Sequence, residues 1–180
     1  HKEYRRQRQM CIRDRASAHA TPIQWTTASG GNGHWYELMS SPSQVTWDQA
    51  NSQATSSSYL GMPGYLASIT NQFENTWVAG NIVHTTTAWI GGSQAIAGDQ
   101  SSWYWSSGES WSYTAWANTQ PDNYLGGLQH TLYYQPNIPL WHDAPNSWSQ
   151  IPFAYVVEYS TVPEIDPAGM GSVLTLVTGA

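Results

Sequence analysis

The stretch "GYLASITNQFENTWVAG", Gly64 to Gly80, leads from a mainly apolar segment into a helix pattern. Asn71 can cap a helix through its side chain, and Glu74 stands three residues later at the capping-box position. Phe73 and Trp77 are four residues apart, so they form an apolar pair on one side of a helix. We therefore predict a short helix directly after "GYLASI".

A similar pairing of strand and helix precedes this stretch. "HWYELM" (34–39) is typical of a strand, and "TWDQANSQA" (46–54) is typical of a helix. Thr46 is the predicted N-cap, with Asp48 in the first turn, where a negative charge is favourable. The apolar residues follow a helical spacing that predicts one buried face, formed by Trp47, Ala50 and Ala54.

Beyond Gly80 the sequence predicts strands and no further helix. The β segments are separated by Gly, Pro, Asn and Ser, and they read "TTTAWIGG", "SSWYWSSG", "QHTLYY", "PLWHDA" and "FAYVVEY". Two helices followed by a strand-rich half indicate an α+β fold. The chain of 180 residues is long enough for one such domain.

The charge of the chain is divided unevenly. All six Lys and Arg lie within residues 1–15, so residues 16–180 hold no basic side chain except His. Ten of the twelve Asp and Glu remain there, after Glu3 and Asp14 are subtracted. Such a surface repels phosphate backbones, which disfavours nucleic acid as a partner. A metal cation is a better candidate.

The two ends of the chain differ from the part between them. Residues 1–15 lack the apolar core of a secretory signal, and "MCIRDR" resembles a translated sequencing-library adapter. We interpret them as an artefact of sequence assembly or, alternatively, as a disordered basic leader, followed by a linker over 16–33. "VPEIDP", within 161–180, resembles a PEP-CTERM-type sorting signal, cut before its membrane helix is complete. On this interpretation the protein is exported to a bacterial surface or extracellular matrix, with a C-terminal anchor or sorting helix.

The order of the segments over 34–160 resembles a C-type lectin-like domain. The pieces that carry the resemblance are "HWYE", "TWDQA", "GYLASIT", "FENTWV", "WIGG", "WYWSSGESWSYTAW", "QPDN", "WHD" and "YVVEY". The resemblance implies a double-loop fold with two helices, antiparallel sheets and a long irregular loop region. Many family members hold two disulfides, whereas Ala54 and His130 stand here where cysteines are expected. The domain should therefore fold without oxidation.

The resemblance also implies a binding loop at "WANTQPDNYLGG" (116–127). In sugar-binding members, a cis proline in this motif separates two side chains whose oxygens bind one Ca²⁺ and the hydroxyls of a sugar. Gln120 and Asp122 supply those oxygens here, and such hard ligands suit Ca²⁺. The order Gln-Pro-Asp implies galactose-type rather than mannose-type binding. Tyr124 is then expected to stack on the sugar.

The rest of the expected calcium site is eroded. Family members use a Trp-Asn-Asp motif on a later strand, and "WHD" keeps Asp143 but has His142 in the Asn position. A glutamate expected about eight residues after Gln120 is missing, with Leu128 and Gln129 in that region. The metal ligands implied are Gln120, Asp122 and Asp143, and the sugar contacts add Tyr124 and His142.

Two functions therefore remain open. The first is calcium-dependent binding of a galactose-type glycan by a surface lectin. The second is a calcium-independent module for protein binding or matrix structure, in which Trp141 is a core residue and the acids are solvated. Asp99 and Glu109 would replace the missing ligand only if their loops reach the site. Catalysis is not expected, because the sequence has no recognisable nucleophile, phosphate-loop or zinc motif.

Overall fold

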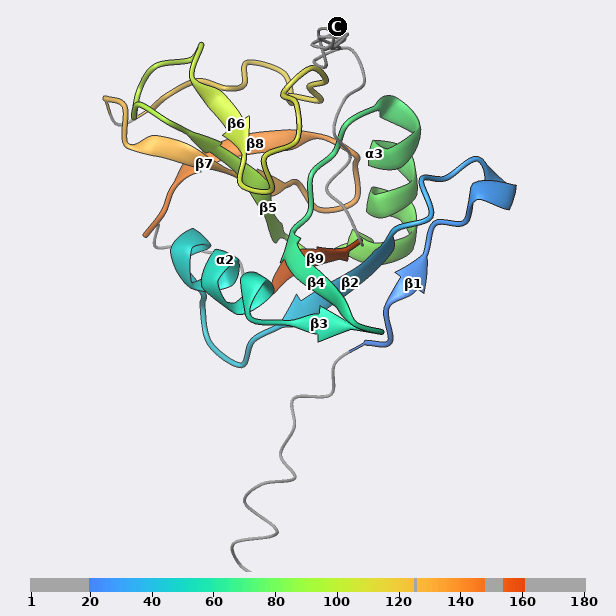
Figure 1. The fold of residues 1–180 in the computed structure, drawn as a ribbon. Coiled ribbons are helices and arrows are strands. Elements are labelled where there is room, and N and C mark those ends of the chain that lie inside the picture. The colour runs from blue at the N-terminus through green and yellow to red at the C-terminus, as the bar shows by residue number, and fades with distance from the viewer. Residues whose placement is uncertain (1–19, 125, 148–153, 161–180) are drawn as a thin grey trace, which may run out of the picture.

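The computed structural model describes residues 20–124, 126–147 and 154–160 (Figure 1). The expected leader, 1–15, and the expected sorting signal, 161–180, lie outside the described residues. Within the part that is described, no helix has the length and apolar character needed to cross a membrane.

The order of elements follows the sequence prediction, with two α-helices early and strands after them. The helical elements are η1 (Thr27–Ser29), α2 (Trp47–Thr55), α3 (Gln72–Val78) and η2 (Ala79–Val83). The strands are β1 (Ile23–Gln24), β2 (Trp35–Ser40), β3 (Ser58–Tyr59), β4 (Met62–Leu66), β5 (Ala88–Gln94), β6 (Trp103–Trp105), β7 (Gln129–Tyr134), β8 (Trp141–Pro145) and β9 (Ala154–Tyr159).

Strand β9 lies at the centre of the sheet. It pairs antiparallel with β2 and β4 and parallel with β5. Because β2 is early in the chain and β9 is last, this pairing brings the two ends of the domain together, with Trp35 opposite Tyr159. From β5 the sheet continues through β7 to β8, and β6 pairs with the other end of β5. The α+β fold predicted from the sequence is confirmed.

The two α-helices contribute to separate apolar clusters formed by alternating strand residues. Successive side chains of a strand point to opposite faces, so neighbouring residues of β9 enter different clusters. Val156 belongs to the cluster that includes Val78 of α3, whereas Val157 belongs to the cluster that includes Ala50 of α2. The aromatic side chains predicted to be mainly core residues include Trp89, Trp105 and Trp141, each at most 1% exposed.

Helix α2 matches its sequence signature. Its N-cap is Thr46, whose hydroxyl accepts a hydrogen bond from the backbone N–H of Gln49. The side chain of Gln49 accepts in return from the N–H of Thr46, which completes a capping box. The predicted apolar face is buried, at Trp47, Ala50 and Ala54.

Helix α3 is capped as predicted but buries a different face. The side chain of Asn71 accepts from the N–H of Glu74. Glu74 and Asn75 are buried, whereas Phe73 is 80% exposed. The expected apolar pair of Phe73 and Trp77 is thus not the buried stripe of this helix. The helical turn also continues past α3 as η2, where the sequence predicted only strands.

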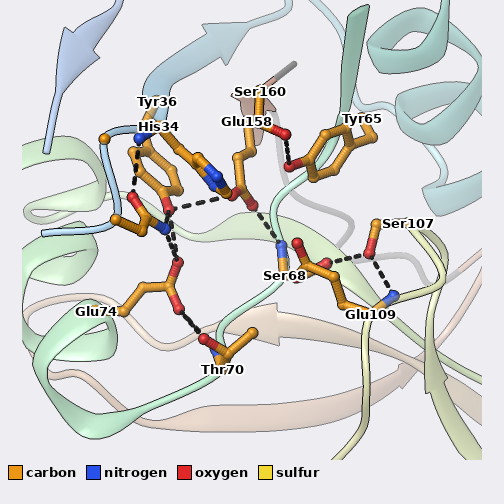
Figure 2. Close-up of polar contacts among 12 residues, drawn as sticks. His34, Tyr36, Tyr65, Ser68, Thr70, Glu74, Ser107, Glu109, Glu158 and Ser160 are labelled. Atoms are coloured by element: carbon orange, nitrogen blue, oxygen red, sulfur yellow. Dashed lines mark hydrogen bonds and ion pairs between the residues drawn. The ribbon is translucent and has the colours of Figure 1, made fainter. Parts of the chain in front are cut away.

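The buried polar face of α3 is satisfied by a network of hydrogen bonds (Figure 2). Glu74 accepts hydrogen bonds from the backbone N–H and the hydroxyl of Thr70, at 2.7 and 2.8 Å. The hydroxyl of Tyr36 donates to Glu74 at 2.5 Å and lies 3.2 Å from Glu158. Glu158 also accepts from the N–H of Ser68 and lies 2.6 Å from the ring nitrogen of His34. The network therefore joins α3 to β2 and β9.

Part of the segment expected to be a linker over 16–33 forms regular structure. Ile23 and Gln24 of β1 pair with β2, and η1 follows. The physical reason is Trp25, which is 5% exposed and belongs to the larger apolar cluster. Burying one indole is worth a few kcal/mol, on the order of 25 cal/mol for each Å² removed from water, so this segment is held against the domain.

Candidate functional site

The Gln-Pro-Asp loop is tied to the sheet before it reaches its polar residues. The N–H of Ala117 donates to the carbonyl of Trp141 at 2.9 Å, and the N–H of Gln120 donates to Ala117. The peptide bond between Gln120 and Pro121 is cis, which confirms the expectation for this motif. Asn123 has a positive φ of 49°, a conformation that Asn tolerates better than most residues.

Asp143 of β8 is joined to the Gln-Pro-Asp loop by hydrogen bonds. Its two carboxylate oxygens accept hydrogen bonds from the backbone N–H groups of Asp122, at 3.3 Å, and Asn123, at 3.0 Å. The N–H of Asp143 donates to the side-chain oxygen of Gln120 at 3.4 Å. The carboxamide of Gln120 in turn donates to Asp122 at 3.0 Å. The structure thus brings together the three side chains predicted as metal ligands.

The two carboxylates of this site have different surroundings. Asp122 is exposed, whereas Asp143 is only 2% exposed. Burial raises the pKa of Asp143, the N–H groups of Asn123 and Asp122 lower it, and the charge of Asp122 raises it further. Since one carboxylate raises the pKa of the other, the pair concentrates negative charge that a bound cation would neutralise.

Tyr124 and His142 occupy different environments beside these ligands. Tyr124 is 68% exposed, and its backbone N–H donates to the Asp122 carboxylate within the same loop. His142 instead stacks on Tyr133, with ring centroids 5.4 Å apart, and its Nε2 lies 2.8 Å from the side-chain oxygen of Gln135. Burial lowers the pKa of His142, and Asp122 opposes this shift. His142 thus flanks the site, and within the described part of the chain its ring makes its hydrogen bond to Gln135 rather than to Gln120, Asp122 or Asp143.

The described residues do not supply a third carboxylate. Leu128 is 59% exposed, and Gln129 donates from its side chain to the carbonyl of Asp143 at 3.3 Å. Asp99 forms hydrogen bonds with Ser101 of its own loop, and Glu109 is buried. Across the described ranges, no three His, Cys, Asp or Glu side chains gather in a group suited to a metal. Neither Asp99 nor Glu109 therefore replaces the missing ligand.

Two neutral amides that sequence reasoning did not select hold a neighbouring loop in place. Asn123 donates from its side chain to the carbonyl of Gly98 at 3.2 Å, and the side chain of Gln94 accepts from the N–H of Gly98 at 2.7 Å. Gly98 packs closely against Gly127, because a Cβ added at Gly98 would lie only 3.1 Å from the Cα of Gly127. The signal in the sequence was the Asn directly after Gln-Pro-Asp, but the partner Gly98 is distant in the chain.

A cluster of tryptophans supports the loop from the interior. The N–H of Trp141 donates to the carbonyl of Ala115, and its indole N–H donates to Asn75 of α3 at 2.9 Å. Trp105 and Trp116 both meet Trp141 edge to face, at 5.6 and 6.0 Å between ring centroids. Trp141 is therefore a core residue, as the calcium-independent hypothesis required, whereas Asp143, which that hypothesis expected to be solvated, is buried. The cluster fixes β8, and with it Asp143, relative to the loop.

Comparison with known proteins places this arrangement in a family. No family model matches the chain. Among solved structures, the C-type lectin CEL-I from Cucumaria echinata superposes with a TM-score of 0.59 at 20% identity, covering 73% of this chain and 93% of that one. An α-N-acetylgalactosamine-specific lectin from Patiria pectinifera is 32% identical over 137 residues, which span 72% of this chain and 76% of the lectin. The chain belongs to the C-type lectin-like family.

Two further similarities show how varied the relatives of this C-type lectin-like domain are. Halomucin of Haloquadratum walsbyi is 32% identical over 165 residues, which are 80% of this chain but only 2% of halomucin. A calcium-independent type II antifreeze protein superposes with a TM-score of 0.58 at 23% identity, covering 79% of this chain and 96% of that one. At that identity the likeness concerns the fold alone.

The donor set of the C-type lectin-like domain is compatible with Ca²⁺ in kind. Ca²⁺ takes about six to eight oxygens, and Gln120, Asp122 and Asp143 offer carboxamide and carboxylate oxygens within one hydrogen-bonded group. Two carboxylates are few for a tight site, since calcium affinity rises with the charge of the ligands. These residues would suit only a weak site, which oxygens from water and from a ligand would have to complete.

Proposed function

We propose that this C-type lectin-like domain binds a galactose-type glycan at the Gln120, Asp122 and Asp143 site, with Ca²⁺ as cofactor. The observation that carries the proposal is the convergence of these three oxygen-bearing side chains next to the exposed ring of Tyr124. Because they come from a loop and from β8, it is the tertiary arrangement that brings these acceptors together, with Asp122 exposed and Asp143 buried.

Each residue has a distinct part in binding. The carboxamide of Gln120 can donate to one sugar hydroxyl, and the carboxylate of Asp122 can accept from a neighbouring one. Asp143 holds the loop through two backbone N–H groups and adds negative charge. Tyr124, exposed beside Asp122, packs its ring on the apolar face of the sugar. Bound Ca²⁺ would supply a positive centre that draws sugar hydroxyl oxygens and the side-chain oxygens together.

The proposal is tested by calorimetric titration of the protein with Ca²⁺ and then with methyl β-D-galactopyranoside, with and without a chelator. We expect Ca²⁺ binding in roughly the 0.1 to 1 mM range, as in extracellular modules, and sugar binding that the chelator abolishes. Asp122→Asn should lose both. The matched control is Asp99→Asn, which removes a carboxylate from a nearby loop and should leave both unchanged, because the Asp99 carboxylate bonds to Ser101 of its own turn.

A charge-neutral exchange sharpens the assignment of the sugar class. The double variant with Gln120→Glu and Asp122→Asn keeps one carboxylate and one carboxamide but reverses their order. Donor and acceptor then trade places, so preference should move from methyl β-D-galactopyranoside towards methyl α-D-mannopyranoside. Unchanged preference would contradict the assigned roles of these two side chains.

A second function is favoured by one specific observation. The four carboxylate oxygens of Asp122 and Asp143 each already accept a hydrogen bond from an N–H group of the protein. A calcium-independent module for protein binding or matrix structure needs no more than this closed network. If Ca²⁺ produces neither heat of binding nor a change in melting temperature, this second function replaces the first. For either function, we propose export to a cell surface or matrix, from the sorting-type motif of the C-terminal segment.

A further inference from the structure

A second groove lies away from the Gln-Pro-Asp loop, and residues of α3 and of the turn that carries η1 line it. It is open to solvent and has a volume of about 880 Å³, which is within the usual range of small-molecule sites. Three aromatic side chains line it, Trp25, Phe73 and Trp77, together with Ser29, Gln72, Thr76, Asn81 and the backbone of Gly30. It shares no lining residue with the calcium and sugar site.

Two of the aromatic residues that line this groove, Trp25 and Trp77, are tightly packed. The rings of Trp25 and Trp77 stack at 22° with centroids 5.8 Å apart, and Trp77 packs in turn on Tyr36. Gly33 donates its N–H to the carbonyl of Trp25, closing the turn over that indole. A Cβ added at Gly31 would lie only 2.4 Å from the same carbonyl, so the turn wraps the indole as closely as a glycine permits.

Phe73 is presented to the groove by the way α3 is buried. The polar residues Glu74 and Asn75 face the interior, and this rotation of the helix leaves Phe73 80% exposed. Phe73 and Trp77 are four residues apart on the helix and are therefore neighbours on its surface. A flat apolar ring held in water beside an indole is available for a ligand with its own flat apolar face.

The polar groups of the groove are neutral. No Asp, Glu, Lys, Arg or His is among the described residues that line it. The carboxamide of Gln72 has no hydrogen-bond partner within the described chain, and Asn81 uses its side-chain N–H on the carbonyl of Trp77, which leaves its oxygen available. The hydroxyl of Ser29 donates to the carbonyl of Thr26 and lies 3.0 Å from the hydroxyl of Thr26, which leaves one lone pair of Ser29 to accept from a ligand. The groove thus offers donors and acceptors without a charge to select an ion.

We propose that this groove is a second, metal-independent carbohydrate site, which binds a neutral pyranose by stacking on Phe73 and Trp77 and by hydrogen bonds to Gln72, Asn81 and Ser29. A pyranose ring has an apolar C–H face and neutral hydroxyls around its edge, which matches flat aromatic rings edged by amides and hydroxyls. A charged ligand would find no counter-charge in the groove. The inference does not rest on the loop site, because neither Ca²⁺ nor Asp122 takes part.

The test is an NMR titration of the ¹⁵N-labelled full chain with maltotriose and methyl β-D-galactopyranoside in the presence of a chelator. We expect at least one of the two sugars to shift the signals of α3 and of the η1 turn. Phe73→Leu, which keeps an apolar side chain but loses the flat ring, should weaken binding about fivefold or more, the scale expected for an aromatic contact. Phe73→Trp should retain binding. Both variants should fold, because the side chain is exposed.

The controls distinguish binding in this groove from binding at the loop site and from nonspecific binding to exposed apolar side chains. Leu60→Ala removes another exposed apolar side chain, 72% exposed in the turn between β3 and β4, and should change nothing. Asp122→Asn should abolish calcium-dependent binding and leave the chelator-resistant binding intact. The inference is overturned if neither sugar binds in chelator, if Phe73→Leu binds as well as the parent, or if Asp122→Asn removes the chelator-resistant binding. Chelator-resistant binding without any calcium-dependent binding would support this groove while refuting the proposed loop site.

Discussion

The pair of buried carboxyls at Glu74 and Glu158 predicts a particular dependence of stability on pH. Burial raises the pKa of Glu158 well above its ordinary value, and the nearby Glu74 raises it further. Burial likewise raises the pKa of Glu74. His34, Tyr36, Tyr65 and Ser68 complete the surroundings of Glu158 (Figure 2). We expect the folded domain to keep a proton on this pair where the unfolded chain has lost it.

The sign of the effect follows from proton uptake on folding. Above the ordinary glutamate pKa of 4.5, the unfolded chain binds fewer protons than the folded one, so the free energy of unfolding falls as pH rises. The loss is at most about 1.4 kcal/mol per pH unit for each retained proton, and it ends at the raised pKa. Between pH 5 and pH 7 the contribution of one carboxyl is therefore up to about 3 kcal/mol.

Glu158→Gln isolates this contribution, because glutamine imitates the protonated acid and cannot titrate. Its side-chain N–H₂ can donate to the ring nitrogen of His34, and its oxygen can accept from the N–H of Ser68. The assay is urea unfolding of parent and variant at several values of pH from 5 to 8. We expect the variant to gain stability relative to the parent as pH rises.

The matched control is Glu37→Gln, since Glu37 is also buried and accepts a hydrogen bond from the hydroxyl of Tyr159. The effect belongs to the Glu74 and Glu158 pair only if this control does not reproduce it. A difference between the parent and Glu158→Gln that is flat, or that grows in favour of the parent as pH rises, would refute the reasoning. Such a result would mean that Glu158 already carries a negative charge in the folded domain across this range of pH.

Two further predictions concern close packing and buried hydrogen bonds. Gly31→Ala should destabilise the domain by about 1 to 3 kcal/mol, because the new Cβ meets the backbone oxygen of Trp25, whereas Gly80→Ala should cost little, since nothing lies within 4 Å of its Cβ position; thermal unfolding compares the two, and equal melting temperatures would contradict the expectation. Trp141→Phe should cost about 1 to 2 kcal/mol more than Trp105→Phe in chemical unfolding. The reason is that the indole N–H of Trp141 donates a hydrogen bond to Asn75, whereas the indole N–H of Trp105 has no partner among the described residues. A smaller cost for Trp141→Phe would show that its hydrogen bond is not stabilising.

Local sequence signals predicted the elements because those signals act over a few residues. Thr46 and Asn71 cap the helices at which they were expected, since a cap needs only the backbone two or three positions later. The strands around Trp89 and Val156 followed from apolar runs between turn residues. The order of these elements was enough to suggest the α+β architecture.

The buried face of α3 was not predictable by the same means. The capping-box position of Glu74 suggested a bond back to the N-cap, and the spacing of Phe73 and Trp77 suggested an apolar pair on one side of the helix. Instead Glu74 turns to Tyr36 and Thr70, and Phe73 is exposed. A carboxylate can be buried only where donors converge on it, and Tyr36 lies 38 positions away in the chain.

For the candidate site too, one part could be predicted from the sequence and the other depended on the tertiary structure. The sequence by itself determined which oxygen-bearing side chains are present, Gln120, Asp122 and Asp143, and that the loop carries an X-Pro bond able to be cis. Only the tertiary structure decided that Asp143 reaches this loop, that His142 turns to Gln135, and that Asp99 and Glu109 stay apart from it. The physical reason is that residue type fixes the chemistry of a ligand, whereas the distance between ligands depends on strand pairing and on the tryptophan packing that sets β8 beneath the loop.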